Sequence, residues 1–113
     1  MDKLIIFKMN SRAKGNRTVK KGRDILENGH WLFDTVEKTG RFTKIKDLFG
    51  LYDAIAVRGK YIKFIQFKTN KQGQKWKIPF KEWAKSHGSK YVSIEIWTWF
   101  DNKGFTIEVM ENG

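Results

Sequence analysis

Two apolar runs in the middle of the chain carry its clearest pattern. Residues 52–57 and 61–68 are rich in β-branched and aromatic side chains, and Arg58, Gly59 and Lys60 lie between them. Two such runs joined by a glycine turn predict a β-hairpin. Residues 91–100 and 105–110 predict a second strand pair joined through 101–104, and residues 31–37 predict one further short strand.

Helical spacing appears before and between these strands. The first helix is predicted to begin at about Asn16, which can cap it. Val19 and Leu26 form its narrow apolar stripe, and Gly29 is a natural end. Gly22 lies inside this helix, where glycine costs about 1 kcal/mol relative to alanine, so a close packing contact is expected there.

A second helix is predicted to begin at Pro79, a residue that suits the first helical turn. Its apolar face combines i, i+3, i+4 and i+7 positions and consists of Phe80, Trp83, Ala84 and His87. Gly88 can end it. The element order is then α-β-β-β-α-β-β, preceded by an N-terminal arm or short strand in residues 1–10. This order predicts an α/β or α+β fold in which helices flank one mixed sheet. We expect one domain spanning residues 1–113.

Charge narrows the possible partners. The chain has 23 Lys and Arg against 12 Asp and Glu, a net charge of +11. Such an excess favours a polyanionic partner, although a basic protein that is merely soluble is the alternative. No apolar run is long enough to span a bilayer, so no membrane partner is expected. The absence of cysteine excludes disulfides, thiolate zinc sites and a cysteine nucleophile, and fits a cytoplasmic location.

The hairpin brings together a possible catalytic group. Gln66 and Lys68 are two residues apart and therefore point to one side of a strand. If Gly59 and Lys60 form a two-residue turn, Arg58 pairs with Tyr61 and Asp53 lies opposite Gln66. Asp53, Gln66 and Lys68 would then converge on one face.

This trio fits phosphodiester hydrolysis. Mg2+ prefers carboxylate and neutral oxygen ligands, which Asp53, Gln66 and the backbone carbonyl of Phe67 can supply. Lys68 can orient the attacking water or stabilise the charge that develops on phosphate. The simpler interpretation is that Asp53 and Lys68 form a cross-strand pair on an exposed sheet face.

The segment from Asp47 to Asn70, DLFGLYDAIAVRGKYIKFIQFKTN, resembles the core of PD-(D/E)XK nucleases. It is most similar to archaeal-type Holliday-junction resolvases and their small phage-encoded relatives. Asp53 matches the strand Asp of that family, Gln66 the Glu/Gln position and Lys68 the Lys of its (E/Q)xK-T/S motif. The likeness extends over about residues 12–110, since a strand into Trp76-Lys77-Ile78-Pro79, a helix and two closing strands follow in the family's order.

The resemblance implies a restriction-endonuclease-like core and a Mg2+- or Mn2+-dependent endonuclease for Holliday junctions or other branched DNA. It also implies a homodimer, in the host cytoplasm if the protein is phage-encoded. The family's Glu on the first helix has no counterpart in Arg17-Thr18-Val19-Lys20. Asp47 is the first candidate for a second metal-binding acid, ahead of Asp34 and Glu27.

Clusters of basic residues surround this motif in the sequence, and phosphate neutralisation by them would make DNA affinity depend steeply on salt. The candidate DNA-binding residues are Arg12, Lys14, Arg17, Lys20, Lys21, Arg23, Lys44, Lys46, Lys71 and Lys75, with Arg41 and Lys77 beside them. A solvated helix face is the alternative for any one cluster.

Trp97 and Trp99 point to one side of their strand, and we expect them to cover a core or a subunit interface rather than to stack on bases. His30 and His87 lack metal-ligand spacing and receive no catalytic role. Two other functions remain open: a non-catalytic DNA-binding module on the same fold, and an RNA-binding protein.

Overall fold

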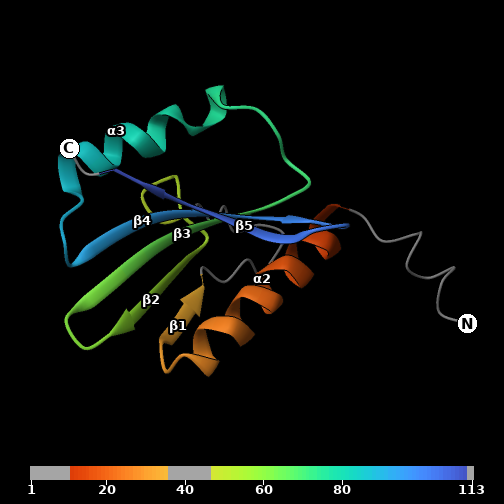
Figure 1. Cartoon of the computed structure of the whole chain (residues 1–113), viewed down its shortest axis with the longest axis horizontal. Coiled ribbons are helices and arrows are strands. Elements are labelled where there is room, and N and C mark those ends of the chain that lie inside the picture. The colour runs from red at the N-terminus through yellow and green to blue at the C-terminus, as the bar shows by residue number, and fades with distance from the viewer. Residues whose placement is uncertain (1–10, 36–46, 112–113) are drawn as a thin grey trace, which may run out of the picture.

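The computed structural model describes residues 11–35 and 47–111, and within them the predicted order of helices and strands is confirmed (Figure 1). The elements are α2 (Ser11–Asn28), β1 (Leu32–Thr35), β2 (Ala54–Arg58), β3 (Tyr61–Thr69), the 3-10 helix η1 (Lys75–Lys77), α3 (Ile78–His87), β4 (Val92–Phe100) and β5 (Gly104–Met110). The expected N-terminal arm, residues 1–10, lies outside the described residues.

The five strands form one mixed sheet in the order β1-β2-β3-β4-β5. All neighbouring strands are antiparallel except β3 and β4, which are parallel and are connected through α3. Figure 1 shows α2 and α3 on opposite faces of the sheet. The expected mixed sheet flanked by helices is therefore present, in an α+β arrangement.

The face under α2 holds one of two hydrophobic cores. Leu26 packs there with Ala54, Ile65, Phe67 and Trp97. The Thr18 and Thr69 hydroxyls form a hydrogen bond of 2.6 Å, which joins the first half of α2 to the end of β3. Side chains at odd-numbered positions of β3 and β4 therefore face α2, because side chains alternate along a strand.

Gly22 meets the ring of Phe67 on this face. A Cβ added at Gly22 would lie only 2.6 Å from Cζ of Phe67, and that ring is 5% exposed. The close packing contact predicted for this glycine is thus confirmed.

The opposite face carries the second core, under α3. Phe80 and Ala84 of the helix contact Ile94 and Ile96 of β4, and Tyr52 completes the cluster. Even-numbered positions of β3 and β4 face this side. The predicted helix stripe is confirmed except at His87, which is exposed and lies against the Trp83 ring at 4.5 Å between centroids.

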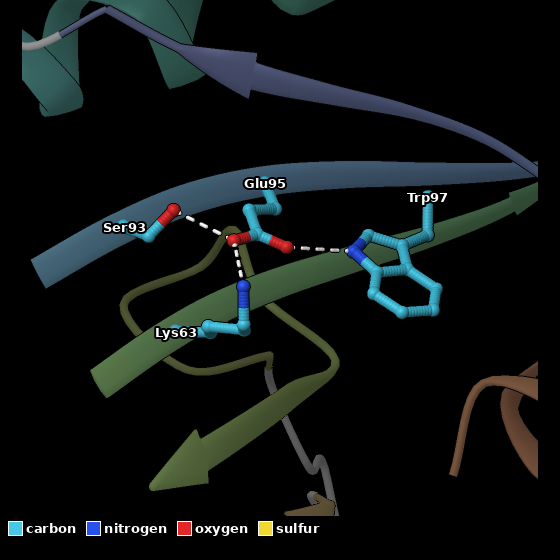
Figure 2. Close-up of polar contacts among 4 residues, drawn as sticks. All are labelled: Lys63, Ser93, Glu95 and Trp97. Carbon is cyan, nitrogen blue, oxygen red and sulfur yellow. Dashed lines mark hydrogen bonds and ion pairs between the residues drawn. The ribbon is translucent and has the colours of Figure 1, made fainter. Parts of the chain in front are cut away.

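A buried carboxylate lies within the α2 face. Glu95 is 2% exposed and its two oxygens accept three hydrogen bonds. Lys63 Nζ donates at 2.6 Å and Ser93 Oγ at 2.7 Å to Oε2, while Trp97 Nε1 donates at 2.9 Å to Oε1 (Figure 2). A buried charge costs several kcal/mol unless it is paired and hydrogen-bonded, and Glu95 meets both conditions.

Two local predictions differ from the structure. The first helix begins at Ser11, so Asn16 lies within it and does not cap it, because the Lys and Arg of this stretch are themselves good helix formers. The residues before Pro79 form the 3-10 turn η1 rather than a strand. Neither helix of the described ranges has both the length and the apolar character needed to cross a bilayer.

Replacing Gly22 by alanine should destabilise the protein despite the better helix propensity of alanine. Overpacking against Phe67 costs about 1–3 kcal/mol, which exceeds the gain of about 1 kcal/mol from removing a helical glycine. Thermal unfolding followed by circular dichroism should show a lower Tm for Gly22→Ala. Glu27→Ala, at an exposed position of α2, is the control. The cost should shrink in a Phe67→Leu background, and an equal cost in both backgrounds would contradict the contact.

Tyr52 is fully buried, and its hydroxyl makes no hydrogen bond within the described residues. Burial raises the pKa of this phenol above its ordinary value of 10.0. Tyr52→Phe should therefore keep or raise stability at pH 7, by up to about 1 kcal/mol, since it removes a desolvated polar group.

The same substitution should flatten the alkaline limb of the stability profile. Above pH 10 the unfolded chain ionises this tyrosine while the folded chain does not, so wild-type stability falls as pH rises. Urea unfolding at pH 7 and pH 11 tests both expectations, with the exposed Tyr61→Phe as control. A clear loss of stability at pH 7 in Tyr52→Phe would show that the hydroxyl has a partner.

Candidate functional site

The predicted register of the β2–β3 hairpin is confirmed. Arg58 pairs with Tyr61 and Ala54 pairs with Ile65, while Gly59 has the positive φ of 61° that a two-residue turn needs at its first position. The Asp53 amide donates to the carbonyl of Ile65, the partner of Ala54, at 2.9 Å, so the chain leaves the regular register directly before β2.

This register places two of the three predicted catalytic residues, Gln66 and Lys68, on the α3 face, because both are even-numbered positions of β3. Asp53 lies just before β2 and is bonded to the same stretch of β3, through the Ile65 carbonyl and the Phe67 amide. Gln66 is 5% exposed, and the other two side chains are partly buried. A pair of ions on a freely exposed sheet face is therefore the wrong description of Asp53 and Lys68.

The Asp53 carboxylate is held at the open edge of β3. The Phe67 amide donates to Asp53 Oδ2 at 3.1 Å. The amide and carbonyl of one strand residue point to the same edge, so the Phe67 carbonyl also faces the side on which Asp53 lies. The carboxylate oxygen and this carbonyl oxygen are two of the ligands that the sequence predicts for Mg2+.

Gln66 bridges two other groups. In the amide orientation that satisfies both of its polar atoms, the side-chain nitrogen donates to the Leu51 carbonyl. Its oxygen then accepts from Lys68 Nζ at 3.3 Å. Gln66 thus joins the turn before β2 to Lys68, and its oxygen faces an ammonium group.

Trp76 borders the site and was not foreseen from the sequence. Its ring centroid lies 5.7 Å from Lys68 Nζ and 5.5 Å from Lys77 Nζ. Its indole nitrogen donates to the Gln72 carbonyl at 3.0 Å. The available signal was an aromatic residue between two lysines, Lys75 and Lys77, immediately before the proline-led helix.

Glu108 was also missed. The register runs from Gln66 through Ile96 to Glu108, so this acid shares the α3 face two strands away from Gln66. Its Oε1 pairs with Lys77 Nζ at 2.7 Å, and the Lys77 side chain is only 13% exposed. Lys77 therefore does not belong with the exposed cations with which the sequence grouped it.

The candidates for a second acid fall in three places. Asp34 pairs with Ile55 and so lies on the α3 face, diagonal to Asp53 on the neighbouring strand. Asp47 opens the 47–52 turn, whose Leu51 packs on that same face. Glu27 is exposed on α2, on the other face. Within the described residues, no three His, Cys, Asp or Glu side chains gather closely enough to hold a metal ion.

The predicted basic residues divide between the two faces. Arg17, Lys20 and Lys21 are exposed on α2, beside the end of β3 to which Thr18 is bonded. Lys20 pairs with Asp24 at 3.5 Å, and Lys21 lies over the Trp99 ring.

Arg23 is partly buried against Phe33, whereas Lys71 and Lys75 are exposed after β3. Arg12 and Lys14 are in the first turn of α2. Arg41, Lys44 and Lys46 lie outside the described residues.

Trp97 of β4 belongs to the core, as predicted, and Trp99 is partly buried on the same face. Trp97 is 3% exposed and packs in the α2-side cluster. The Trp99 ring lies against Phe105 at 5.2 Å between centroids.

Comparison of the chain with models of known protein families and with curated proteins gave no match.

Replacing Gln66 by glutamate should destabilise the protein at neutral pH. A carboxylate at this position would face the Leu51 carbonyl without a proton to donate, and leaving a buried polar group unsatisfied costs about 1–3 kcal/mol. The penalty should shrink as the pH falls towards 4, because a protonated carboxyl can donate to that carbonyl. Chemical unfolding at pH 7 and pH 4 measures the difference. Gln74→Glu, an exposed position with the same charge change, is the control and should show no comparable penalty.

Proposed function

We propose that this chain is a metal-dependent DNA endonuclease that acts on branched or duplex DNA. The observation that supports the proposal best is the hydrogen bond from the Phe67 amide to Asp53, which holds a carboxylate beside the strand that carries Gln66 and Lys68. The proposal is also supported by the order helix, three strands, helix, two strands, which the PD-(D/E)XK resemblance implies and the described fold has, although η1 stands where that family has a strand. The assignment of the fold as a restriction-endonuclease-like core is part of this proposal.

The donor set suits a hard divalent cation in part. The Asp53 carboxylate and the Phe67 carbonyl would hold Mg2+ or Mn2+, with Asp34 or Asp47 as the nearby second acid. Gln66 would contribute its oxygen only after turning away from Lys68. When bound, the cation would supply charge neutralisation for the phosphate and a lowered pKa for a bound water.

Lys68 has the position required of a catalytic cation. Its Nζ lies at the Gln66 amide oxygen and near the Trp76 ring, so its ammonium group is held in place by two neighbours. An ammonium fixed beside the scissile phosphate stabilises the charge that develops there and orients the attacking water. Selectivity for Holliday junctions and assembly as a homodimer rest on the family resemblance alone.

A second function, a DNA-binding module without hydrolysis, is favoured by the contacts of Gln66. Both polar atoms of its amide already have protein partners, Leu51 and Lys68. A residue engaged in this way stabilises the turn before β2 and needs no metal.

Nicking of supercoiled plasmid and of four-way-junction DNA in Mg2+ separates the two functions. Wild type should cleave, and Asp53→Asn and Lys68→Ala should each lower the rate by about 100-fold or more. Lys85→Ala, on the exposed side of α3, is the matched control and should cleave at the wild-type rate. Salt-sensitive binding without cleavage by wild type would favour the module, and cleavage by Lys68→Ala at the wild-type rate would remove the mechanism.

A readout independent of cleavage tests the metal. Mg2+ or Mn2+ should raise the Tm of wild type by preferential binding to the folded state. The rise should be absent in Asp53→Asn and present in Lys85→Ala. An equal rise in all three proteins would place the cation elsewhere.

A further inference from the structure

At the other end of the sheet, two tyrosines lie side by side. Tyr61 opens β3, Tyr91 directly precedes β4, and the Ile62 amide donates to the Tyr91 carbonyl at 2.8 Å. The two ring centroids are 5.7 Å apart, and Tyr61 is 44% exposed. Both side chains belong to the odd-numbered set that faces the α2 side, beyond the last residue of that helix.

Cations surround this pair. Lys60 Nζ lies 4.8 Å and Lys90 Nζ 5.0 Å from the centroid of the Tyr91 ring, and both lysines are exposed. Within the part of the chain that the structure describes, neither lysine forms an ion pair.

The neighbouring strand continues the same pattern. Arg58 pairs opposite Tyr61, and its guanidinium lies 4.6 Å from the Trp31 ring centroid while donating to the Gly29 carbonyl at 2.9 Å. Lys63 Nζ also lies 4.8 Å from the centroid of the Trp31 ring, but Lys63 is paired with Glu95 (Figure 2). We call the surface formed by Trp31, Arg58, Lys60, Tyr61, Lys90 and Tyr91 the hairpin-end patch.

We propose that the hairpin-end patch binds an unpaired DNA strand. The exposed Tyr61 ring and the partly exposed Tyr91 ring beside it offer surface on which bases stack. Lys60 and Lys90, both against Tyr91, lie where the phosphates of that strand would pass. Duplex DNA keeps its bases stacked within the helix and can use only the cations. A strand with free bases is the partner that uses both features of the patch.

The patch is separate from the candidate catalytic residues. Lys68 is seven positions after Tyr61 along β3, which corresponds to roughly 23 Å at about 3.3 Å per residue. The two sites also face opposite sides of the sheet. This inference rests on the proposal that the chain binds DNA, and it adds a preference for substrates that combine duplex and unpaired segments.

Fluorescence anisotropy with a labelled 12-nucleotide oligothymidine and a blunt 12-base-pair duplex tests the patch. Tyr61→Ala/Tyr91→Ala should weaken oligothymidine binding by at least about fivefold and duplex binding by less than about twofold. Tyr61→Phe/Tyr91→Phe should retain wild-type affinity, since the rings remain. Both positions lie at the surface, and unchanged circular dichroism spectra will show that the variants are folded.

The contribution of Lys60 and Lys90 is tested by the salt dependence of oligothymidine binding. Lys60→Gln/Lys90→Gln should lower the slope of log affinity against log salt for oligothymidine by roughly 1.4, or about 0.7 for each lost phosphate contact. Lys81→Gln/Lys85→Gln, with the same charge change on α3, should leave that slope unchanged.

Equal losses for oligothymidine and duplex in the tyrosine variant would overturn the proposal, as would no loss for either. Plasmid nicking separates the two hypotheses. If wild type does not nick plasmid but the tyrosine variant loses oligothymidine affinity, the nuclease function fails and the unpaired-strand site stands. If nicking depends on Lys68 but replacing both tyrosines leaves oligothymidine affinity unchanged, the nuclease function stands and the unpaired-strand site fails.

Discussion

The pairing of β2 with β3 is the constraint on which both candidate sites depend. A slip of one residue would send every side chain of a strand to the other face, and it would move Gln66 and Lys68 under α2. The glycine turn at residues 59–60 prevents this, because Arg58 and Tyr61 must then pair. One short turn thus decides that the Gln66 amide and the Lys68 ammonium share one face, while the tyrosine pair belongs to the other.

β3 also integrates the two layers. It pairs on one side with β2 and on the other, in parallel, with β4, and its two faces contribute to separate cores. Phe67 shows the consequence most directly. Its ring packs under Gly22 of α2, while its backbone amide holds Asp53 at the edge of the strand. A change in how α2 sits on the sheet therefore reaches the candidate catalytic carboxylate through a single residue.

The sequence was sufficient for the elements, the strand register and the close contact at Gly22, because these follow from local periodicity, turn chemistry and the cost of a helical glycine. It was insufficient where distant residues meet. The hydrogen bond from Gln66 to Leu51 and the contact of Lys68 with Trp76 depend on how a loop and a helix settle on the sheet. The pairing of Lys77 with Glu108 joins η1, directly before α3, to β5, and no spacing rule connects those positions. The predicted start of the first helix was wrong by about five residues, because Asn16 is a residue type that favours a helix cap although the helix begins at Ser11.

The buried carboxylate of Glu95 has a consequence for how this sequence can vary. Lys63 and Glu95 lie on adjacent strands, and each lessens the cost of burying the other. Losing Lys63 alone would leave an uncompensated charge beneath Trp97 and Ser93, whereas replacing both by apolar residues can be nearly neutral. A variant changed at only one of the two positions is thus expected to be less stable than the variant changed at both. Homologous chains should keep the two residues together or lose them together, so that positions 63 and 95 vary as a pair.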